Sequence, residues 1–173
     1  LPALRGEGTA PQKISQIIQA DLERSGLFRG VPAGDVQLDE NSVPDMAQWR
    51  QRAADALSCG SLTKLADGRY DVRFRLWDVV KAQDLGGQGF VVVQGDLRLV
   101  AHRIADYIYE KLTGEPGVFS TRIAYVLKSG PRYELQIADA DGSNAQTALA
   151  SKEPIISPAW SPDGSRLAYV SFE

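Results

Sequence analysis

The sequence predicts an α/β amino-terminal domain, with three helices on a small mixed sheet, followed by an incomplete all-β propeller segment of about one blade. Two observations carry this prediction. Apolar residues recur at helical spacing in three stretches of the first two-thirds, and this period disappears after residue 118. In the last third, "TRIAYV" at 121–126 is echoed by "SRLAYV" at 165–170, an offset of 44 residues. A four-stranded propeller blade occupies roughly 40–45 residues, so the offset matches one blade.

The predicted domains are 1–115, the α/β unit, and 118–173, the first blade and the start of a second. Glu115-Pro116-Gly117 forms the boundary between them. A lone blade leaves strand edges open, so we expect residues 1–173 to be part of a longer protein. Residue 1 is Leu rather than Met, which indicates that the chain has been trimmed or processed.

Composition excludes several classes of protein. The 173 residues are 43% hydrophobic and 24% charged, an ordinary globular profile, and the net charge is −3. No stretch concentrates Lys and Arg, so we expect no nucleic-acid partner. The uncharged apolar run at 90–93 is far too short to span a bilayer. Cys59 is the only cysteine, so no intramolecular disulfide can form.

Local signals place the helices. The predicted spans are about 9–26, from just after residue 42 to residue 57, and 97–113. Thr9 with Gln12 fits a capping box, and Asp96 is placed to cap the third helix. Gly26 and Gly114 are placed to end the first and third helices.

Alternation with a period of two places the strands of the first domain. The apolar side of one strand consists of Tyr70, Val72, Phe74, Leu76 and Val80. Asp67-Gly68 predicts a hairpin turn to a partner strand at about 59–65. "DLGGQG" at 84–89 is expected to be a flexible loop, followed by a short buried strand at 90–93.

In the last third, short runs separated by turn residues predict strands. They lie at 121–128, 133–142, 146–151, 156–161 and 166–172. "DADGSN" at 139–144 suggests a calcium loop, but Gly142 comes too early for an EF-hand, so we favour a turn. In "SPDGSR", Pro162 and Gly164 supply the backbone angles of a second turn.

Three parts of the sequence together resemble the TolB family, periplasmic components of the Tol–Pal system. They are "IIQADLERSGLF", "YEKLTGEPGVFSTRIAYV" and the tail "DADGSNAQ…SPAWSPDGSRLAYVSFE". The resemblance covers nearly the whole chain, most loosely between about residues 30 and 100. In the family a strand and a flexible segment, implicated in binding TolA, precede the first helix. Only ten residues precede Pro11 here, so we expect this segment to be absent from the sequence.

The resemblance implies a non-enzymatic periplasmic adaptor. Family members bind the lipoprotein Pal through the propeller and couple an inner-membrane energised complex to the outer membrane. They support envelope integrity and cell division, and colicins exploit the same surface during import. No cofactor or metal is implied.

The candidate partner-binding residues are Ser157, Pro158 and Trp160, in the repeat's most distinctive stretch. Trp160 also has a simpler interpretation, as a large aromatic filling the wedge between blades. His102, the only histidine, has no acidic or cysteine partner at i ± 4, so we expect a surface or half-buried structural role. Cys59 is interpreted as a small buried hydrophobe.

Two other functions stay open at this stage. Related repeats occur in propellers that gate serine peptidases, although no G-x-S-x-G nucleophile motif is present in this sequence. A receptor-type sensor with a propeller is the third possibility. The sequence downstream would discriminate, by showing either further blades or a catalytic domain.

Overall fold

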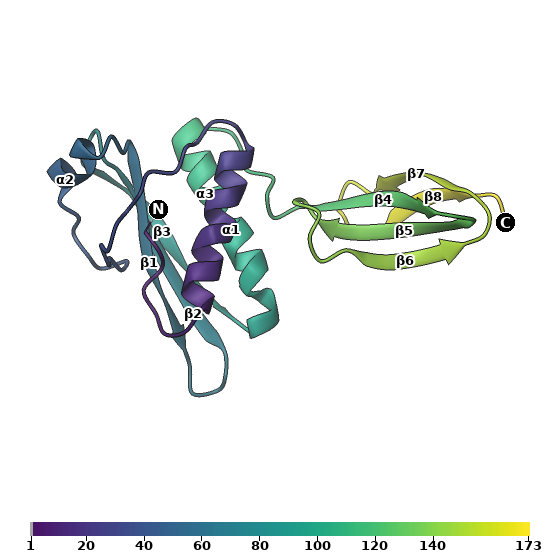
Figure 1. Ribbon diagram of the computed structural model, residues 1–173, viewed down its shortest axis with the longest axis horizontal. Coiled ribbons are helices and arrows are strands. Elements are labelled where there is room, and N and C mark those ends of the chain that lie inside the picture. The colour runs from purple at the N-terminus through teal and green to yellow at the C-terminus, as the bar shows by residue number, and fades with distance from the viewer. Residues whose placement is uncertain (1) are drawn as a thin grey trace. The chain divides into compact units, whose positions relative to one another are not determined.

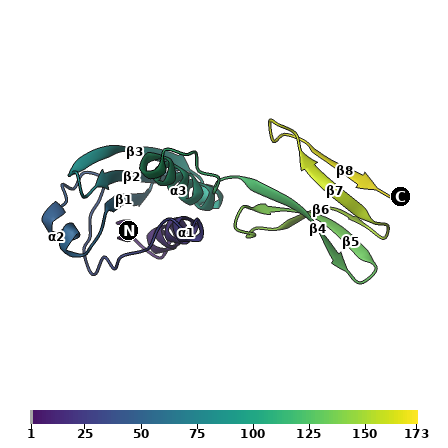
Figure 2. The same ribbon diagram turned by 90° about the horizontal axis from the view of Figure 1, so that it is seen from above.

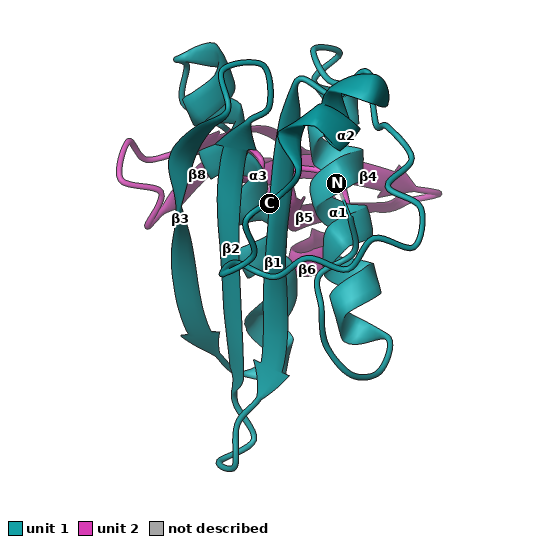
Figure 3. Cartoon of the chain, turned by 90° about the vertical axis from the view of Figure 1, so that its left-hand side faces the viewer, with its two compact units in different colours: residues 1–117 teal, residues 118–173 magenta. Residues whose placement is uncertain are grey.

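The change from mixed α/β structure to purely β structure occurs at the Pro116-Gly117 dipeptide. The computed structural model describes residues 2–173, and it separates into two units that divide between residues 117 and 118 (Figures 1 and 3). Within these residues, no helix combines the length and the apolar character needed to cross a membrane.

The first unit is a two-layer α/β structure. Its elements are α1 (Ala10–Arg24), α2 (Met46–Gln51), β1 (Ala56–Lys64), β2 (Tyr70–Asp78), β3 (Gln83–Val92), the 3-10 turn η1 (Gln94–Asp96) and α3 (Leu97–Thr113). The three strands form an antiparallel sheet in the order β1-β2-β3, with one parallel bridge from Arg5 to Ser61 at the outer edge of β1. Helices α1 and α3 pack together over one face of this sheet (Figure 2).

The main core lies between the two long helices and the sheet. It is built from the apolar stripes of both helices and the alternate residues of β2 that point toward them. Its most buried members include Ile14, Ile18, Val72, Phe74, Leu76, Val100 and Ile104. The period-two pattern of β2 therefore predicted its buried face correctly as far as Leu76. Beyond Asp78 the strand ends, so Val79 is buried and Val80 is 61% exposed, the reverse of the prediction.

A second, smaller core covers the opposite face of the sheet near its end. Trp49 of α2 packs there with Ala54, Leu57 and Val79, and partly buried residues of the 33–38 segment close over them. The Arg50 guanidinium donates hydrogen bonds to the carbonyl oxygens of Val79 and Val80, at 2.9 and 3.1 Å, which fixes α2 against the end of β2.

Several details of the first unit differ from the predictions. Asp96 makes no side-chain capping hydrogen bond, and Val91 and Val93 of the predicted buried strand are exposed. The second helix ends at Gln51 rather than at residue 57, because Ala53 has φ 56° and the chain then enters β1, where Leu57 pairs with Trp77. The predicted loop 84–89 belongs to β3. Thr9 is the N-cap of α1 but its side chain makes no capping hydrogen bond, so the capping box is wrong.

Glycine is required inside β3. A Cβ at Gly87 would meet the carbonyl oxygen of Phe74 and lie 2.9 Å from the Cα of Arg75 on the neighbouring strand. The close approach of β3 to β2 therefore explains a glycine-rich sequence that reads as a loop.

The second unit is entirely β. Its strands are β4 (Arg122–Ser129), β5 (Arg132–Asp139), β6 (Gln146–Ser151), β7 (Ile155–Trp160) and β8 (Leu167–Ser171). They form a three-stranded antiparallel sheet, β4-β5-β6, and a two-stranded sheet, β7-β8. Strand β7 contacts β4 and β5, and the buried side chains Leu135, Ala138 and Ile155 lie in this unit. These are strands of a partial propeller, as predicted.

Candidate functional site

The candidate partner-binding residues all lie on β7, around a bulge. The pairing of β7 with β8 shifts register between Ile156 and Ala159, and Ser157 in this interval has φ 55°. Positive φ is uncommon for a residue other than glycine. Ser157 is exposed and Pro158 is half-buried, so the bulge presents a fixed, irregular backbone at the surface of this unit.

Trp160 follows the bulge and pairs with Leu167. Its side chain is half-buried, and its indole Nε1 is buried with no hydrogen-bond partner among the described residues. Most buried indole N–H groups find a partner. Trp160 is therefore partly buried in this structure, between a core residue and a surface residue. All three candidate residues lie within one short strand, β7.

The turn between β7 and β8 is fixed by a carboxylate. Asp163 accepts hydrogen bonds from the hydroxyls of Ser161 and Ser165, at 2.5 and 2.7 Å, and from the Ser165 N–H at 3.1 Å. These hydrogen bonds lower the pKa of Asp163 from 3.8 to about 2, and the two from the serine hydroxyls have the largest effect. Gly164 has φ 67° and its N–H donates to the Ser161 carbonyl oxygen, as expected for the turn.

The "DADGSN" stretch forms the turn that links β5 to β6. The Gly142 N–H donates to the Asp139 carbonyl oxygen at 2.8 Å, and Gly142 has φ 82°. The Ser143 N–H donates to the Asp141 carboxylate, and the Asn144 amide donates to the Asp139 carboxylate. These local hydrogen bonds show that the polar residues of this stretch form a turn, the interpretation favoured from the sequence.

The first unit contains a buried polar pair, His102 and Asp21, that no sequence pattern predicted. His102 on α3 is 2% exposed, and its Nδ1 lies 2.5 Å from the Oδ2 of Asp21 on α1, which is 1% exposed. The expected surface or half-buried role of His102 is therefore wrong, because its acidic partner comes from a helix 81 positions away rather than from i ± 4. Arg24 also contacts Asp21, at 3.0 Å.

Cys59 is buried in β1, as predicted. Burial, reinforced by the negative charge of Asp39, raises the pKa of its thiol to about 11. At neutral pH the thiol is protonated, and a protonated thiol is a poor nucleophile.

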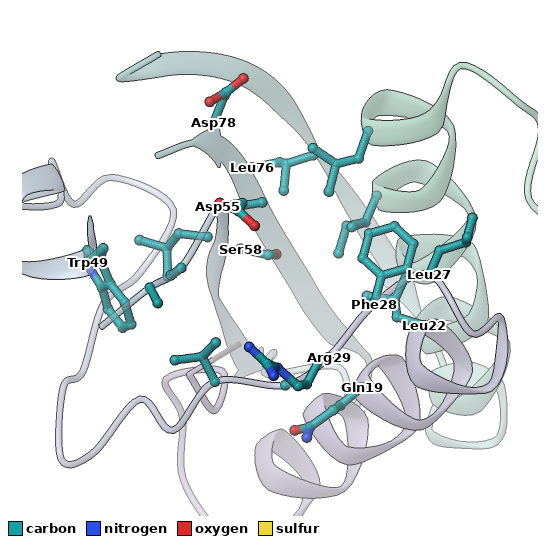
Figure 4. A pocket seen from close by; sticks show the side chains of 18 of the residues that line it. Gln19, Leu22, Leu27, Phe28, Arg29, Trp49, Asp55, Ser58, Leu76 and Asp78 are labelled. Atoms are coloured by element: carbon teal, nitrogen blue, oxygen red, sulfur yellow. The ribbon is translucent and has the colours of Figure 1, made fainter. Parts of the chain in front are cut away.

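A groove of about 690 Å³ opens in the first unit (Figure 4). Its walls come from the end of α1, the segment 27–31, residues 53–58, the end of β2 and the last turns of α3. The labelled side chains show apolar groups, including Leu22, Phe28 and Leu76, with Asp55, Asp78 and Arg29 around them (Figure 4). Trp49 of α2 also lines it. No single sequence motif marks this groove, because its walls come from six separate segments.

An α/β domain followed by the first strands of a propeller defines a class of modular protein. Two family models match the chain: the TolB amino-terminal domain over residues 1–85 and the TolB beta propeller domain over residues 109–173. The chain belongs to the TolB family, and it comprises the amino-terminal domain and the beginning of the propeller.

Individual relatives agree with this assignment. The chain is 68% identical to the Tol-Pal system protein TolB of Albidiferax ferrireducens over 99% of its length, and 68% identical to that of Polaromonas naphthalenivorans over 98%. It covers 40% and 39% of these two proteins, so it spans about two-fifths of their length. The crystal structure of TolB from Acinetobacter baumannii matches 99% of the chain and 43% of its own chain, with 36% identity and a TM-score of 0.85.

These matches confirm the predicted family and fold. The relatives are named as components of a Tol-Pal system, in agreement with the prediction that the protein is not an enzyme. The peptidase-gating alternative receives no support, because the propeller segment and the domain before it both match TolB models.

Proposed function

We propose that the protein is a periplasmic, non-enzymatic adaptor of the Tol–Pal system that binds the lipoprotein Pal through its propeller. The observation that supports this most strongly is the order of two TolB domains in one chain, together with high identity to proteins named for that system. An adaptor of this kind holds protein partners at an envelope complex and needs no catalytic group. Outer-membrane integrity and cell division are the processes that it would support.

The all-β unit has two kinds of exposed surface, of which only one is suited to a protein partner. Apolar side chains on both β7 and β8 are exposed, among them Ile156 at 45%, Tyr169 at 44% and Val170 at 48%. Neighbouring blades cover such faces in a propeller, and the relatives are long enough to contain further blades. The β7 bulge, by contrast, presents irregular backbone of the kind that partners recognise.

Within this function, Ser157, Pro158 and Trp160 are the proposed partner-binding residues. The positive φ of Ser157 supports the proposal, because backbone held in an uncommon region often marks a functional site. TolA and colicins are the further proposed partners. Binding of TolA or of a colicin would likewise involve no chemical reaction of this protein.

A pull-down tests the main proposal. The full-length protein, immobilised through its carboxyl terminus, should retain purified soluble Pal at physiological salt. A Ser157→Arg variant should retain less Pal, and a matched Gln146→Arg variant, which places the same charge on exposed β6, should retain as much as the wild type. Absence of Pal from the wild-type eluate would remove the adaptor proposal, and equal retention by both variants would remove the residue assignment.

A further inference from the structure

Strand β3 forms an exposed edge of the sheet in the first unit. It is the last strand in the order β1-β2-β3, and Figure 3 shows it at the side of the sheet opposite β1. Residues 87–89 are exposed, and Val91 is 48% exposed. Because glycine has no side chain, the exposed surface of Gly87 and Gly89 is backbone. The bridge from Arg5 lies at the other edge, on β1.

The register of the sheet shows which backbone groups of β3 point outward. The Gly60 carbonyl oxygen on β1 accepts a hydrogen bond from the Arg5 N–H, so Gly60 points its backbone groups away from β2. Gly60 lies opposite Phe74, and Phe74 lies opposite Gln88. Direction alternates along antiparallel strands, so Phe74 and Gln88 point their groups at each other. The residues that point theirs outward are Gly87, Gly89 and Val91. No residue within 2–173 pairs with β3 along this outer side.

This edge lacks the usual protection against an added strand. Edge strands are commonly protected by charged residues, proline or a bulge. Residues 85–95 contain no charged residue and no proline. The register of β3 against β2 shifts before Gly87, and the pairs from Gly87 to Val92 are regular. A regular, uncharged edge with free backbone groups is a template for an additional strand.

A shallow hollow of about 260 Å³ lies beside this edge. Its lining includes Arg73 and Arg75 of β2, residues 87–89 of β3 and residues 40–41. Gly89 lies opposite Arg73, and a Cβ at Gly89 would lie 3.5 Å from the Arg73 Cγ. The two arginines therefore border a strip of β3 in which the glycines leave the backbone uncovered.

An aromatic side chain on an added strand would fill this hollow. Cross-strand aromatic residues stabilise glycines at sheet edges, because the ring covers the backbone that glycine leaves bare. Arg73 and Arg75 are half-exposed there, and a guanidinium group stacks favourably on an aromatic ring. Arg73 lies 3.0 Å from the Asp71 carboxylate and Arg75 lies 3.5 Å from that of Asp84. Because both cations already have anionic partners, the hollow favours an aromatic side chain over a charged one.

A second copy of the chain fits this edge less well. Antiparallel pairing of two β3 strands about Gly89 would set glycine opposite glycine and leave both hollows unfilled. Such a contact supplies few side chains toward the ~1,200 Å² that a stable interface buries.

We propose that the outer edge of β3 binds an extended segment of a partner protein, which adds a strand along residues 87–91 and places an aromatic side chain over Gly89. Backbone hydrogen bonds to the outward groups of β3 would align the segment. Arg73 and Arg75 would select the aromatic residue. These residues belong to the amino-terminal unit, whereas the proposed Pal-binding residues belong to β7.

Hydrogen exchange of the full-length protein tests the edge itself. In the free protein, the amides of Gly87, Gly89 and Val91 should exchange at least about tenfold faster than those of Gln88 and Phe90, which point to β2. Equal protection of both sets would show that the edge is already covered in the full-length protein, and would overturn the proposal.

Selection from a peptide library tests the occupant. The probe is a randomised nine-residue library displayed on phage and selected against the immobilised full-length protein. The enriched peptides should share Phe, Tyr or Trp at one position. Their synthetic versions should slow hydrogen exchange at the Gly89 amide by at least about tenfold, as expected when a strand forms there. Failure to enrich any peptide, or protection elsewhere without protection at Gly89, contradicts the proposal.

Two substitutions locate the contacts. Val91→Pro removes an outward N–H that bonds to nothing in β2, and should weaken peptide binding by at least about tenfold. Val91→Thr is the matched control, because it alters the same exposed side chain and keeps the N–H; it should bind as the wild type does. Arg73→Lys keeps the charge but loses the planar guanidinium, and should weaken aromatic peptides by about threefold to tenfold. Versions with Leu in place of the aromatic residue should not distinguish Arg73→Lys from the wild type.

The fold and the oligomeric state complete the test. Circular dichroism and the unfolding midpoint should match the wild type for each variant. Equal peptide binding by Val91→Pro and Val91→Thr would exclude strand addition at this edge. In analytical ultracentrifugation, a dimer that Val91→Pro abolishes and peptides fail to displace would assign the edge to a second copy instead. A monomer whose Gly89 amide peptides protect supports the proposal.

Discussion

The Nδ1 of His102 on α3 lies 2.5 Å from the Oδ2 of Asp21 on α1, and both side chains are almost completely buried. This polar contact joins the two helices that cover the sheet. A buried polar group is costly when its partner is removed, because it has left water without a replacement hydrogen bond. The pair is therefore expected to make the packing of α1 on α3 specific.

Replacing His102 by Ala should lower the free energy of unfolding by about 3 kcal/mol, since the Asp21 carboxylate would lose its buried partner. Urea denaturation followed by circular dichroism measures this. Arg24→Ala is the matched control, because Arg24 contacts the same carboxylate from a half-exposed position and should cost less than about 1 kcal/mol. An equal decrease in the free energy of unfolding for the two variants would contradict a larger contribution of the His102 contact to stability.

Cys59 should be unreactive in the folded chain. Its thiol is buried and has a pKa of about 11, so the thiolate is scarce at pH 7.5. Alkylation by iodoacetamide should be at least about a hundredfold slower than in a Cys59→Ser chain carrying Val43→Cys at an exposed position. Full reactivity should return in denaturant. Rapid alkylation of the native chain would mean that β1 is accessible.

Asp163 should give the β7–β8 turn a dependence on acid pH. Its pKa is lowered to about 2 in the folded chain, so the ionised form is favoured by folding. The stabilisation is complete above the ordinary pKa of 3.8 and is lost as the pH falls through about 2. NMR should show the Ser165 amide shift titrating in this window. In an Asp163→Ala chain, the same amide should exchange faster at pH 6 and show no such titration.

Gly60 should not tolerate a side chain. A Cβ there would meet the Arg73 carbonyl oxygen and lie 2.8 Å from the Cα of Phe74 on the neighbouring strand. Gly60→Ala should therefore reduce stability by about 2 kcal/mol, the usual scale of overpacking. Gly95→Ala is the control, since a Cβ at Gly95 meets nothing within 4 Å. A thermal shift of the same size in both variants would contradict the close approach of β1 and β2.

Regular patterns were sufficient to predict most of the fold. The helical stripes of α1 and α3 and the alternation in β2 reflect the face that each element buries, and that face is visible in the sequence. The 44-residue echo was equally informative, because its two copies form β4 and β8, both strands of the all-β unit. Gly114 ends α3 with φ 82°, as its position predicted.

Features that depend on distant contacts could not be predicted in this way. Residues 52–57 have helical spacing, but pairing with β2 draws Leu57 into a strand, so tertiary contacts override the local preference. Glycines are unfavourable in strands, so the sequence of β3 predicted a loop. Only the structure shows that Gly87 lies too close to β2 for a side chain. The Asp21–His102 pair and the groove each combine segments far apart in sequence, and no local motif marks either.

The most direct test of the central claim is a calorimetric titration of soluble Pal into the full-length protein at physiological salt. The account predicts saturable binding of one Pal per protein, with a Kd below about 10 μM. The Leu27→Glu variant should bind equally well, because Leu27 belongs to the amino-terminal unit and the proposed Pal-binding residues belong to β7. No heat of binding with up to about 100 μM Pal would contradict the assignment of this chain to an adaptor that holds Pal through its propeller.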